Sequence, residues 1–445
     1  MKNYKILIIG LGSIGKNLAL SLNEKGYKIN VWDIDKKKKI EINKAKKINL
    51  VKNIDKFIEL NDIIIILAIP SGIKVDNFIN KNIFLFKKKS YIVDIGNNHP
   101  SDTIRRHNLL KKKEVSYIGC GFSGGIHGAR NNASIMLGCS GNDFKNLKDL
   151  FTDIAGKKKK DFLKLIGSNP SAGNYVKIIH NAIEYGIMQS IADYYLLMKE
   201  EIKLNDKEIV KELNKLNKLL GNSYLVNITK EIIESPKSEK FLIKNILDQV
   251  DDNSTGTWAV SLSTDCKYPI PSLSSAVEAR FFSKQKRIFK NVKKIIKKKD
   301  IKSKKFMENM QTVVKLSIVS CYIQGIGLLS EVSKVKKINI NLKNVLLNWS
   351  TNSIIRSSLL QKYFKLIKKN KIEIEHLVKS EFSLKRKKIL IDFMKFLVKN
   401  NLFLPSANSV FAWSNMLLHK KYISFSLIQS QRNFFGSHKI KFLKK

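Results

Sequence analysis

A glycine-rich turn near the start of the chain constrains the fold more than any other feature. Gly10-Leu-Gly12-Ser-Ile-Gly15 follows an apolar run at residues 5–9 and precedes a segment of helical character at residues 16–23. A lone pattern of this kind is weakly specific, but a strand before it and a helix after it form a dinucleotide-binding βα unit. Glycines allow a tight turn and close backbone approach, and the helix N-terminus then receives the pyrophosphate. We therefore expect a dinucleotide to bind at Gly10, Gly12, Ser13, Ile14 and Gly15.

An acidic residue that bears on the choice of coenzyme follows the second apolar run, residues 29–32. A carboxylate here accepts hydrogen bonds from the adenine ribose and repels a 2′-phosphate. Asp33, with Asp35 beside it, therefore favours use of NAD, as well as or instead of NADP. The alternative role for an acid in this place is to cap the next helix, and that role is open to Asp35. The lysines at residues 36–39 weaken the argument for NAD, because positive charges nearby attract a 2′-phosphate.

The pattern of apolar and polar residues changes near residue 170. Before it, short apolar runs alternate with amphipathic segments, which indicates a doubly wound parallel sheet covered by helices on both faces. After it, long segments with a 3.6-residue period dominate, which indicates an all-helical part. We predict three parts: a Rossmann-like domain at 1–172, a helical substrate and dimerisation domain at 173–430, and a tail at 431–445. The predicted strands are residues 5–9, 29–32, 63–67, 91–93 and 115–118.

The formal net charge of +45 over 445 residues is extreme and first indicates a nucleic acid or an anionic surface as partner. The lysines, however, are spread along the whole chain in short runs, without one basic stripe interleaved with aromatic residues. We therefore expect no dedicated nucleic-acid partner, although such a field attracts small anionic ligands.

The cysteines and the apolar segments bear on the compartment. Cys120, Cys139, Cys266 and Cys321 are far apart, without CxxC spacing, so we expect reduced, mostly buried thiols and no metal site. The first residues lack the shape of a signal peptide. Residues 313–330 come nearest to a membrane span, but Lys315 and Gln324 interrupt them. We expect a cytoplasmic protein without membrane contact.

A second informative segment is the run Asn174-Tyr-Val-Lys-Ile-Ile-His-Asn-Ala-Ile-Glu-Tyr-Gly186. At helical spacing, Lys177, His180, Asn181 and Glu184 share one stripe, while isoleucines cover the other sides. A buried helix that keeps a lysine and a glutamate on one stripe needs a reason. One reason is catalysis by a base and an acid, and the structural alternative is an ion pair beside a hydrogen-bonded core histidine.

Together with the glycine turn, this helix resembles that of the decarboxylating 6-phosphogluconate dehydrogenases, and the resemblance runs in order over nearly the whole chain. The segments that carry it are Asp94-Ile-Gly-Asn97, residues 121–130, 172–189, 246–248, 255–258 and 279–280, Trp349, and residues 355–357 and 431–438. The resemblance implies oxidation and decarboxylation of 6-phosphogluconate to ribulose 5-phosphate with NADP, and a homodimer with a shared active site.

The resemblance also implies roles for individual residues. Lys177 is the base that takes the proton of the C3 hydroxyl group, and Glu184 protonates C1 after CO2 is lost. A free lysine titrates near ~10.4, so burial must lower its pKa by about two to three units, and the same dry pocket raises the pKa of the glutamate. Arg432 and His438 reach the substrate phosphate from a partner subunit. The other implied substrate ligands are Asn97, which also meets the nicotinamide, and Ser123, Gly124, Gly125, His180, Asn181, Tyr185 and Arg280.

The chain departs from the family pattern at several points. Asn253 stands where the family carries a phosphate-binding lysine, and Asp251 and Asp252 add negative charge next to it. This change predicts weaker phosphate binding. Asn174 replaces a histidine, Asp33-Ile-Asp35 replaces the Asn-Arg-Thr that grips the 2′-phosphate, and Pro70-Ser71-Gly72 replaces a Lys-Ala-Gly turn.

Two other interpretations remain open from the sequence. One is a β-hydroxyacid dehydrogenase of the same superfamily, which shares the glycine turn, the Ser-Gly-Gly loop and the lysine but generally lacks the second helical half and the arginine-bearing tail. The other is a catalytically silent basic binding protein, against which the intact Lys177 and Glu184 argue.

Overall fold

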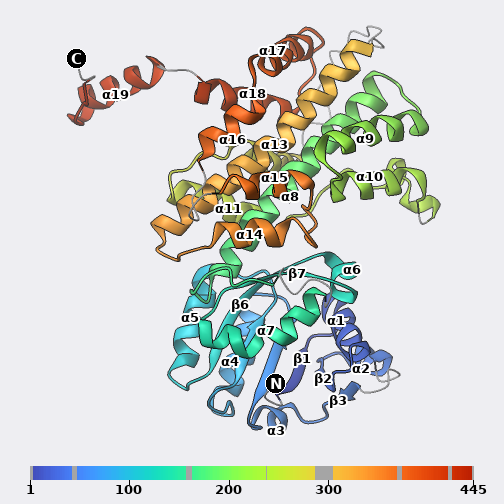
Figure 1. Cartoon of the computed structure of the whole chain (residues 1–445), viewed down its shortest axis with the longest axis vertical. Helices are drawn as coiled ribbons and strands as arrows, with labels where there is room; N and C mark the ends of the chain where they lie inside the picture. The colour runs from blue at the N-terminus through green and yellow to red at the C-terminus, as the bar shows by residue number, and fades with distance from the viewer. Residues whose placement is uncertain are drawn as a thin grey trace.

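The computed structural model describes residues 4–42, 48–156, 163–236, 238–285, 304–367, 373–418 and 423–442. Two lobes follow one another along the long axis of the molecule, an α/β lobe and a helical lobe (Figure 1). Helix α8, Ala172–Leu196, begins against the first lobe and runs into the second. This architecture confirms the expected fold class.

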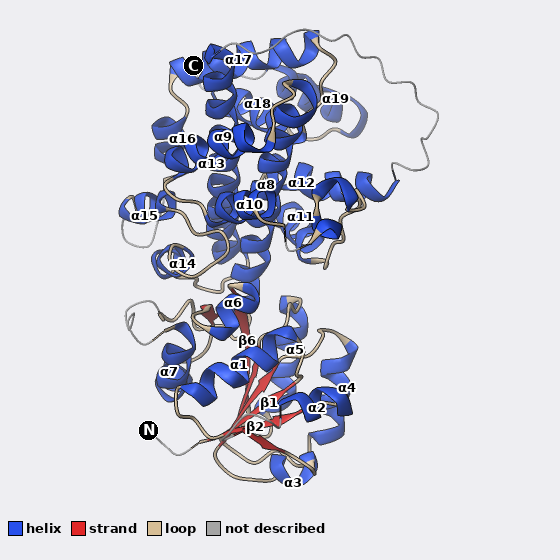
Figure 2. Cartoon of the chain, turned by 90° about the vertical axis from the view of Figure 1, so that its right-hand side faces the viewer, coloured by secondary structure: helices blue, strands red, loops and turns tan. Residues whose placement is uncertain are grey.

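Within the described residues, seven strands form one sheet in the order β3-β2-β1-β4-β5-β6-β7. Figure 2 draws the strands in red. All neighbours pair in parallel except β6 and β7, which are antiparallel. The strands are β1 Lys5–Ile9, β2 Ile29–Trp32, β3 Ile48–Leu50, β4 Ile63–Leu67, β5 Tyr91–Asp94, β6 Ser116–Ser123 and β7 Ser134–Leu137.

The five predicted strands are present, and β5 and β6 extend further towards their carboxyl ends than predicted. Strands β3 and β7 were not predicted. They have three and four residues, and both lie at the edges of the sheet.

Both faces of the sheet are covered, because alternate residues of each strand point to opposite sides. Ile8 and Ile66 pack with Leu18 and Leu22 of α1 (Ser13–Glu24) and with α7 (Gly141–Ala155). Leu7 and Ile65 pack with α4 (Ile73–Asn82) and α5 (Pro100–Lys111) on the other side. The remaining helices of this lobe are α2 (Lys36–Ile42), α3 (Ile54–Ile58) and α6 (Gly125–Arg130).

The chain order reverses at β1, which pairs with β2 on one side and with β4 on the other. In open parallel sheets, ligands bind outside the carboxyl ends of the strands at such a switch point. The glycine turn, the turn at residues 68–72 and the loop at residues 95–99 all follow carboxyl ends of neighbouring strands there. The fold thus gathers these three segments at one edge.

The helical lobe is built around α8 and α13 (Lys304–Val335). Gly325 lets them approach, since a Cβ there would lie 2.5 Å from Ile183 Cδ1. The sequence of α13 is long and apolar enough to cross a membrane, but 89% of its apolar window is buried inside the protein. The other helices are α9 Asp206–Leu220, α10 Tyr224–Glu234, α11 Thr255–Asp265, α12 Pro271–Gln285, α14 Leu342–Trp349, α15 Ser358–Lys365, α16 Ile374–Glu381, α17 Leu384–Lys399, α18 Pro405–Leu418 and α19 Ile423–Gly436.

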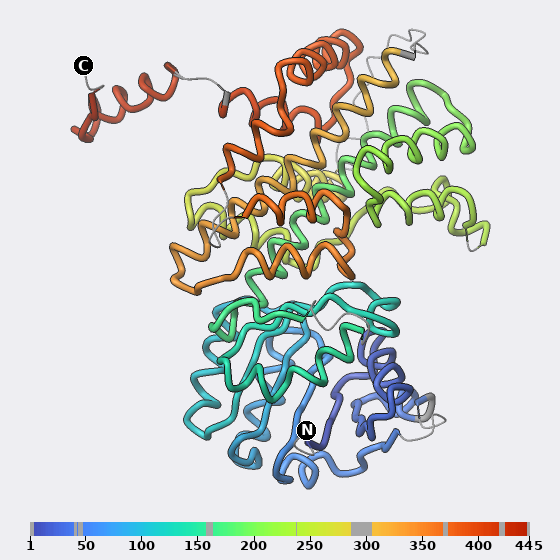
Figure 3. Tube along the Cα trace, viewed as in Figure 1, coloured from blue at the N-terminus to red at the C-terminus, as the bar shows by residue number. Residues whose placement is uncertain are grey.

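Helix α19 stands off from the rest of the helical lobe (Figure 3). None of its residues is buried, and Phe434 and Phe435 are 94% and 74% exposed. The tail expected from residue 431 therefore begins inside a helix.

Candidate active site

The glycine turn has the geometry of a dinucleotide site. Gly10 has φ +97°, and a Cβ there would lie 2.5 Å from Ala68 O, so the tight turn itself requires glycine. A Cβ at Gly12, by contrast, would meet nothing within 4 Å. No side chain of a described residue caps α1 at Gly12, so the amide groups of its first turn are available to an anion. These residues fit a bound pyrophosphate.

Asp33 joins the glycine turn to the end of β2. Its Oδ2 accepts a 2.5 Å hydrogen bond from the Leu11 amide, and its Oδ1 accepts one of 2.8 Å from the Asp35 amide. Asp35 Oδ1 accepts from the Lys37 amide at 2.9 Å, so Asp35 takes the capping role at the start of α2. Of the two carboxylates, Asp33 is therefore the one fixed beside the turn.

A close contact between α8 and the sheet sets where the catalytic candidates lie. A Cβ on Gly173 would lie 2.2 Å from Met136 O of β7 and 2.6 Å from Gly119 O of β6, so only glycine fits. Gly121 of β6 in turn touches Lys177, whose Cβ would lie 2.9 Å from a Cβ on Gly121. The first turns of α8 are thus pressed against β6 and β7, and Lys177 starts from the sheet surface.

Lys177 is buried on α8, and the side chain of Glu184 on the same helix is 18% exposed. Burial lowers the pKa of Lys177 to about 8, and the nearby Glu184 opposes that shift. Burial also raises the pKa of Glu184, against the charges of Lys177 and Arg280. Both shifts bring the groups towards neutrality, so the lysine can accept a proton and the glutamic acid can donate one.

A chain of hydrogen bonds centred on His180 ties four segments together. The Ser123 hydroxyl lies 3.0 Å from His180 Nε2, and His180 Nδ1 lies 3.1 Å from Asn181 Oδ1. Asn181 Nδ2 donates to Thr255 Oγ1 at 3.1 Å, and the Ile354 amide donates to Ser123 Oγ at 3.3 Å. Burial is the main cause that holds the pKa of His180 well below its usual value, with Lys177 adding to it. The imidazole is therefore neutral and fixes the end of β6 against α8 and α11.

The phosphate candidates form a second group one turn further along α8. The Tyr185 hydroxyl donates to Asn253 Oδ1 at 2.9 Å, and the Arg280 guanidinium carbon lies 3.3 Å from the centre of the Tyr185 ring. Arg280 also donates to Asp251 O at 3.0 Å, and Asp251 pairs with Lys284 at 2.8 Å. The structure thus brings Tyr185 and Arg280 together. Asn253 lies beside them, at the position where the family pattern has a lysine.

Two substrate candidates lie elsewhere. Arg432 and His438 are exposed at the far end of α19, where Arg432 donates to Gln429 Oε1 and Asn433 Nδ2 donates to His438 O. Figures 1 and 3 show this helix well away from the first turns of α8. A single chain therefore does not assemble all the predicted site residues.

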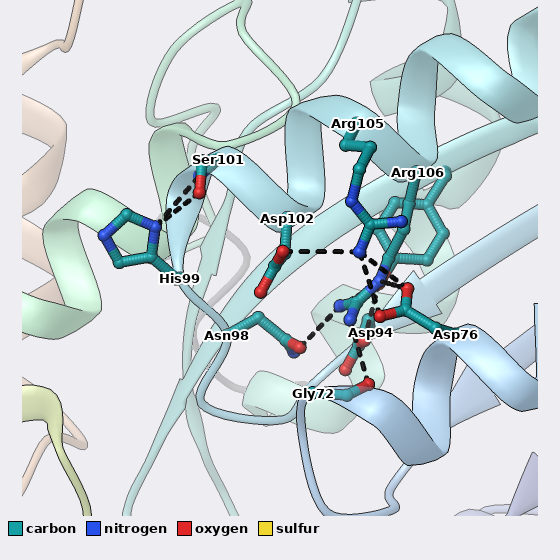
Figure 4. Close-up of polar contacts among 10 residues, drawn as sticks. Gly72, Asp76, Asp94, Asn98, His99, Ser101, Asp102, Arg105 and Arg106 are labelled. Atoms are coloured by element: carbon teal, nitrogen blue, oxygen red, sulfur yellow. Dashed lines mark hydrogen bonds and ion pairs between the residues drawn. The ribbon is translucent and has the colours of Figure 1, made fainter.

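A buried polar network beneath the loop at residues 95–99 was missed by the sequence analysis. It centres on Arg106 and Asp94, both 0% exposed, with Asn98 and Tyr117 as further members (Figure 4 shows Asp94, Asn98 and Arg106). The sequence did carry a signal for this network. At helical spacing, Arg106 shares the buried face of α5 with Thr103 and Leu110, and a charged residue on such a face indicates a buried polar contact.

A dinucleotide-binding lobe joined to a helix with a buried lysine and a partly buried glutamate defines the protein as a dinucleotide-dependent dehydrogenase. Comparison with known proteins gives the family. The model described as the NAD binding domain of 6-phosphogluconate dehydrogenase matches residues 5–166, and that described as the 6-phosphogluconate dehydrogenase C-terminal domain matches residues 173–445. The chain belongs to the family of decarboxylating 6-phosphogluconate dehydrogenases.

Individual relatives agree with this family. The decarboxylating 6-phosphogluconate dehydrogenase of Buchnera aphidicola from Acyrthosiphon pisum is 32% identical, over 98% of this chain and 96% of its own length. That of Spinacia oleracea is 29% identical, over 98% and 94%. The solved 6-phosphogluconate dehydrogenase of Plasmodium falciparum, studied with NADP+ and with 6-phosphogluconate, superposes with a TM-score of 0.89 at 28% identity, over 99% and 98% of the two chains.

The β-hydroxyacid dehydrogenases are more distant. The 3-hydroxyisobutyrate dehydrogenase of Mycobacterium tuberculosis covers 64% of this chain and 94% of its own, with a TM-score of 0.50 at 16% identity, which shows a shared fold alone. The comparisons thus support the main interpretation, an oxidoreductase of the 6-phosphogluconate dehydrogenase family, and not the alternatives.

Proposed function

We propose that this protein oxidises and decarboxylates 6-phosphogluconate to ribulose 5-phosphate, with Lys177 as the base and Glu184 as the acid. Lys177 takes the proton from the C3 hydroxyl group as hydride leaves C3, and the dinucleotide, when bound, supplies the hydride acceptor. The resulting 3-keto acid loses CO2 because the carbonyl group β to the carboxylate takes up the electrons, and Lys177 returns its proton to that oxygen to give the enediol. Glu184 then gives its proton to C1 of the enediol.

The observation that carries this proposal is the state of Lys177, a buried lysine whose pKa is lowered to about 8. A general base works best when its pKa is near the working pH. The raised pKa of Glu184 favours the protonated form that the last step needs. Around this pair, Ser123, His180 and Asn181 form a fixed polar wall suited to the sugar hydroxyl groups, and Gly124 and Gly125 follow Ser123 with positive φ angles.

The phosphate end of the substrate is assigned to Tyr185 and Arg280 of one chain. A guanidinium group suits bidentate contact with phosphate, and here it is stacked on the tyrosine ring and so held in place. One arginine and one tyrosine leave most of the charge of a phosphate uncompensated. Arg432 and His438 of a second copy would complete the site.

We therefore propose a homodimer in which α19 of each chain reaches the site of the other. This proposal is supported by the exposure of α19, which leaves Leu427, Phe434 and Phe435 largely exposed to water in a single chain. Mixing two inactive variants, Lys177→Met and Arg432→Ala, tests this arrangement. A hybrid dimer then holds one site with an intact Lys177 and an intact Arg432, so activity should return. Mixed subunits that exchange but stay inactive would rule out a shared site.

For the coenzyme, we propose that NAD is used at least as readily as NADP, because Asp33 presents a carboxylate beside the glycine turn. The measure is the ratio of kcat/KM for the two coenzymes in the native protein and in Asp33→Asn, with Asp35→Asn as the matched control. A strong NADP preference that Asp33→Asn leaves unchanged would refute the assignment.

The main proposal is tested by following reduced coenzyme with 6-phosphogluconate and, in parallel, with 3-hydroxyisobutyrate. We expect turnover of the first, and Lys177→Met should reduce it by at least about two to four orders of magnitude. Turnover of the second acid alone, or near-normal rates in Lys177→Met, would overturn the proposal.

A further inference from the structure

Arg106 of α5 is a fully buried cation that the mechanism above does not use. Its side chain is 0% exposed, and its Nε donates a 2.8 Å hydrogen bond to Asp76 Oδ1 of α4. A buried charge is costly unless it is paired and its donors are satisfied. An arginine in this place therefore calls for a role that a neutral side chain cannot fill.

The guanidinium group of Arg106 joins two loops at the carboxyl edge of the sheet. Nη2 donates to Gly72 O at 3.0 Å, and Nη1 donates to Asn98 Oδ1 at 2.7 Å (Figure 4). Gly72 closes the turn between β4 and α4, and Asn98 lies in the loop between β5 and α5. Because β4 and β5 are adjacent, one planar group spans both loops.

The same network fixes the backbone on both sides of Asn97. Asn98 Nδ2 donates to Gly96 O at 3.1 Å, and the Gly96 amide donates to Asp94 Oδ1 at 2.9 Å. The Tyr117 hydroxyl donates to Asp94 Oδ2 at 2.6 Å and lies 3.4 Å from Arg106 Nη1. The side chain of Asn97 is only partly buried and has no hydrogen bond to any residue that the structure describes. Its amide is thus held by its neighbours while remaining available to a ligand.

We propose that Arg106 is a positioning residue for hydride transfer, which locks the Gly72 turn and the Asn97 loop in one fixed geometry. This inference rests on the proposed place of Asn97 between the nicotinamide and the sugar. Reacting groups must lie within about 3–3.5 Å in an aligned geometry, and a misplacement of about 1 Å can cost about 100-fold in rate. Loss of the guanidinium fork should therefore lower the rate of the chemical step more than the binding of either ligand.

The test compares Arg106→Lys with Arg105→Lys. Arg105 donates to the same Asp76 but has no hydrogen bond to Gly72 or Asn98, which makes it a matched control. A lysine at 106 keeps the charge but cannot form the planar fork. We expect kcat to fall about 10- to 100-fold in Arg106→Lys, with a larger isotope effect for substrate deuterated at C3. The dissociation constant of ADP, a probe of the adenine half of the coenzyme site, should change less than about twofold in both variants.

A second variant covers the case in which Arg106→Lys does not fold. Asn98→Ala keeps the pair of Arg106 with Asp76 but removes the link of Arg106 to the Asn97 loop, together with the bond from Asn98 to Gly96 O. It should show the same loss of kcat. Methylguanidinium added to Arg106→Ala should restore part of the activity.

Asn97→Ala separates this inference from the proposed function. An impaired Asn97→Ala, with Arg106→Lys and Asn98→Ala at the native kcat, would overturn the role of Arg106 alone. A fully active Asn97→Ala would instead remove Asn97 from the site.

Discussion

Lys177 and Glu184 lie seven residues apart on α8, and each influences the pKa of the other. Burial lowers the pKa of the lysine to about 8, and the carboxylate keeps it from falling further. In return, the lysine opposes the rise in the pKa of Glu184 that burial causes. The pair therefore has linked consequences for stability and for catalysis.

The first consequence is that Lys177 destabilises the fold at neutral pH. Its pKa is about 8 in the folded protein and about 10.4 in an unfolded chain, so the folded state binds fewer protons between those values and stability rises with pH there. Lys177→Met should therefore raise the free energy of unfolding at pH 7 by up to about 3 kcal/mol. The gain should shrink above pH 8 and vanish near pH 10.5, as measured by urea unfolding across this range. A variant that is less stable than the native protein at pH 7 would contradict the lowered pKa.

The second consequence concerns the pH profile of Glu184→Gln. The base must be neutral, so kcat/KM of the native protein should rise with pH through about 8. Removing the carboxylate removes the interaction that raises the pKa of Lys177, so the rising limb should move to lower pH. Hydride transfer in a single turnover should be affected less than the final protonation. The exposed Glu231→Gln is the control, and a limb that moves to higher pH would show that the coupling has the opposite sign.

Asn253 offers a gain-of-function test at the phosphate end. Asn253→Lys restores the cation of the family pattern next to Tyr185 and Arg280, and we expect it to lower KM for 6-phosphogluconate about tenfold. The KM of the coenzyme should stay the same. Asn245→Lys adds the same charge at an exposed position, and it controls for the effect of one more positive charge on the overall electrostatic field of the protein. Equal effects of the two substitutions would mean that Asn253 does not face the phosphate.

Ser254 carries backbone strain at the start of α11. Its φ is +65°, in the left-handed region that favours glycine. Ser254→Gly should therefore raise the free energy of unfolding by about 0.5–1 kcal/mol, after the entropy cost of glycine. Ser261→Gly, in the interior of the same helix, should instead lower it by about 0.5 kcal/mol. Thermal unfolding of both variants checks the contrast, and a loss of stability in Ser254→Gly would show that the turn is unstrained.

The local patterns of the sequence predicted much of this molecule, and long-range pairing explains what they missed. The glycine turn, the five predicted strands and the helical second half follow from hydrophobic periodicity and from the turn residues that bound each segment. The Arg106 network does not, because Asp76 and Arg106 are thirty residues apart and meet only once β4 and β5 pair. The placement of Arg432 and His438 depends on a second chain, and it stays a prediction.

The glycine contacts of α8 show the same limit. The sequence predicted the stripe of Lys177, His180 and Glu184 but not the reason for the angle of the helix. That reason is Gly173, which lets α8 touch the backbones of β6 and β7. Such a contact joins residues from three elements and leaves no local pattern.

The most direct measurement is a product balance with 6-phosphogluconate labelled with carbon-13 at C1. We predict one equivalent of labelled CO2 for each equivalent of reduced coenzyme, and ribulose 5-phosphate as the remaining product. Reduced coenzyme without release of labelled CO2, or no reduced coenzyme with either NAD or NADP, would contradict this prediction.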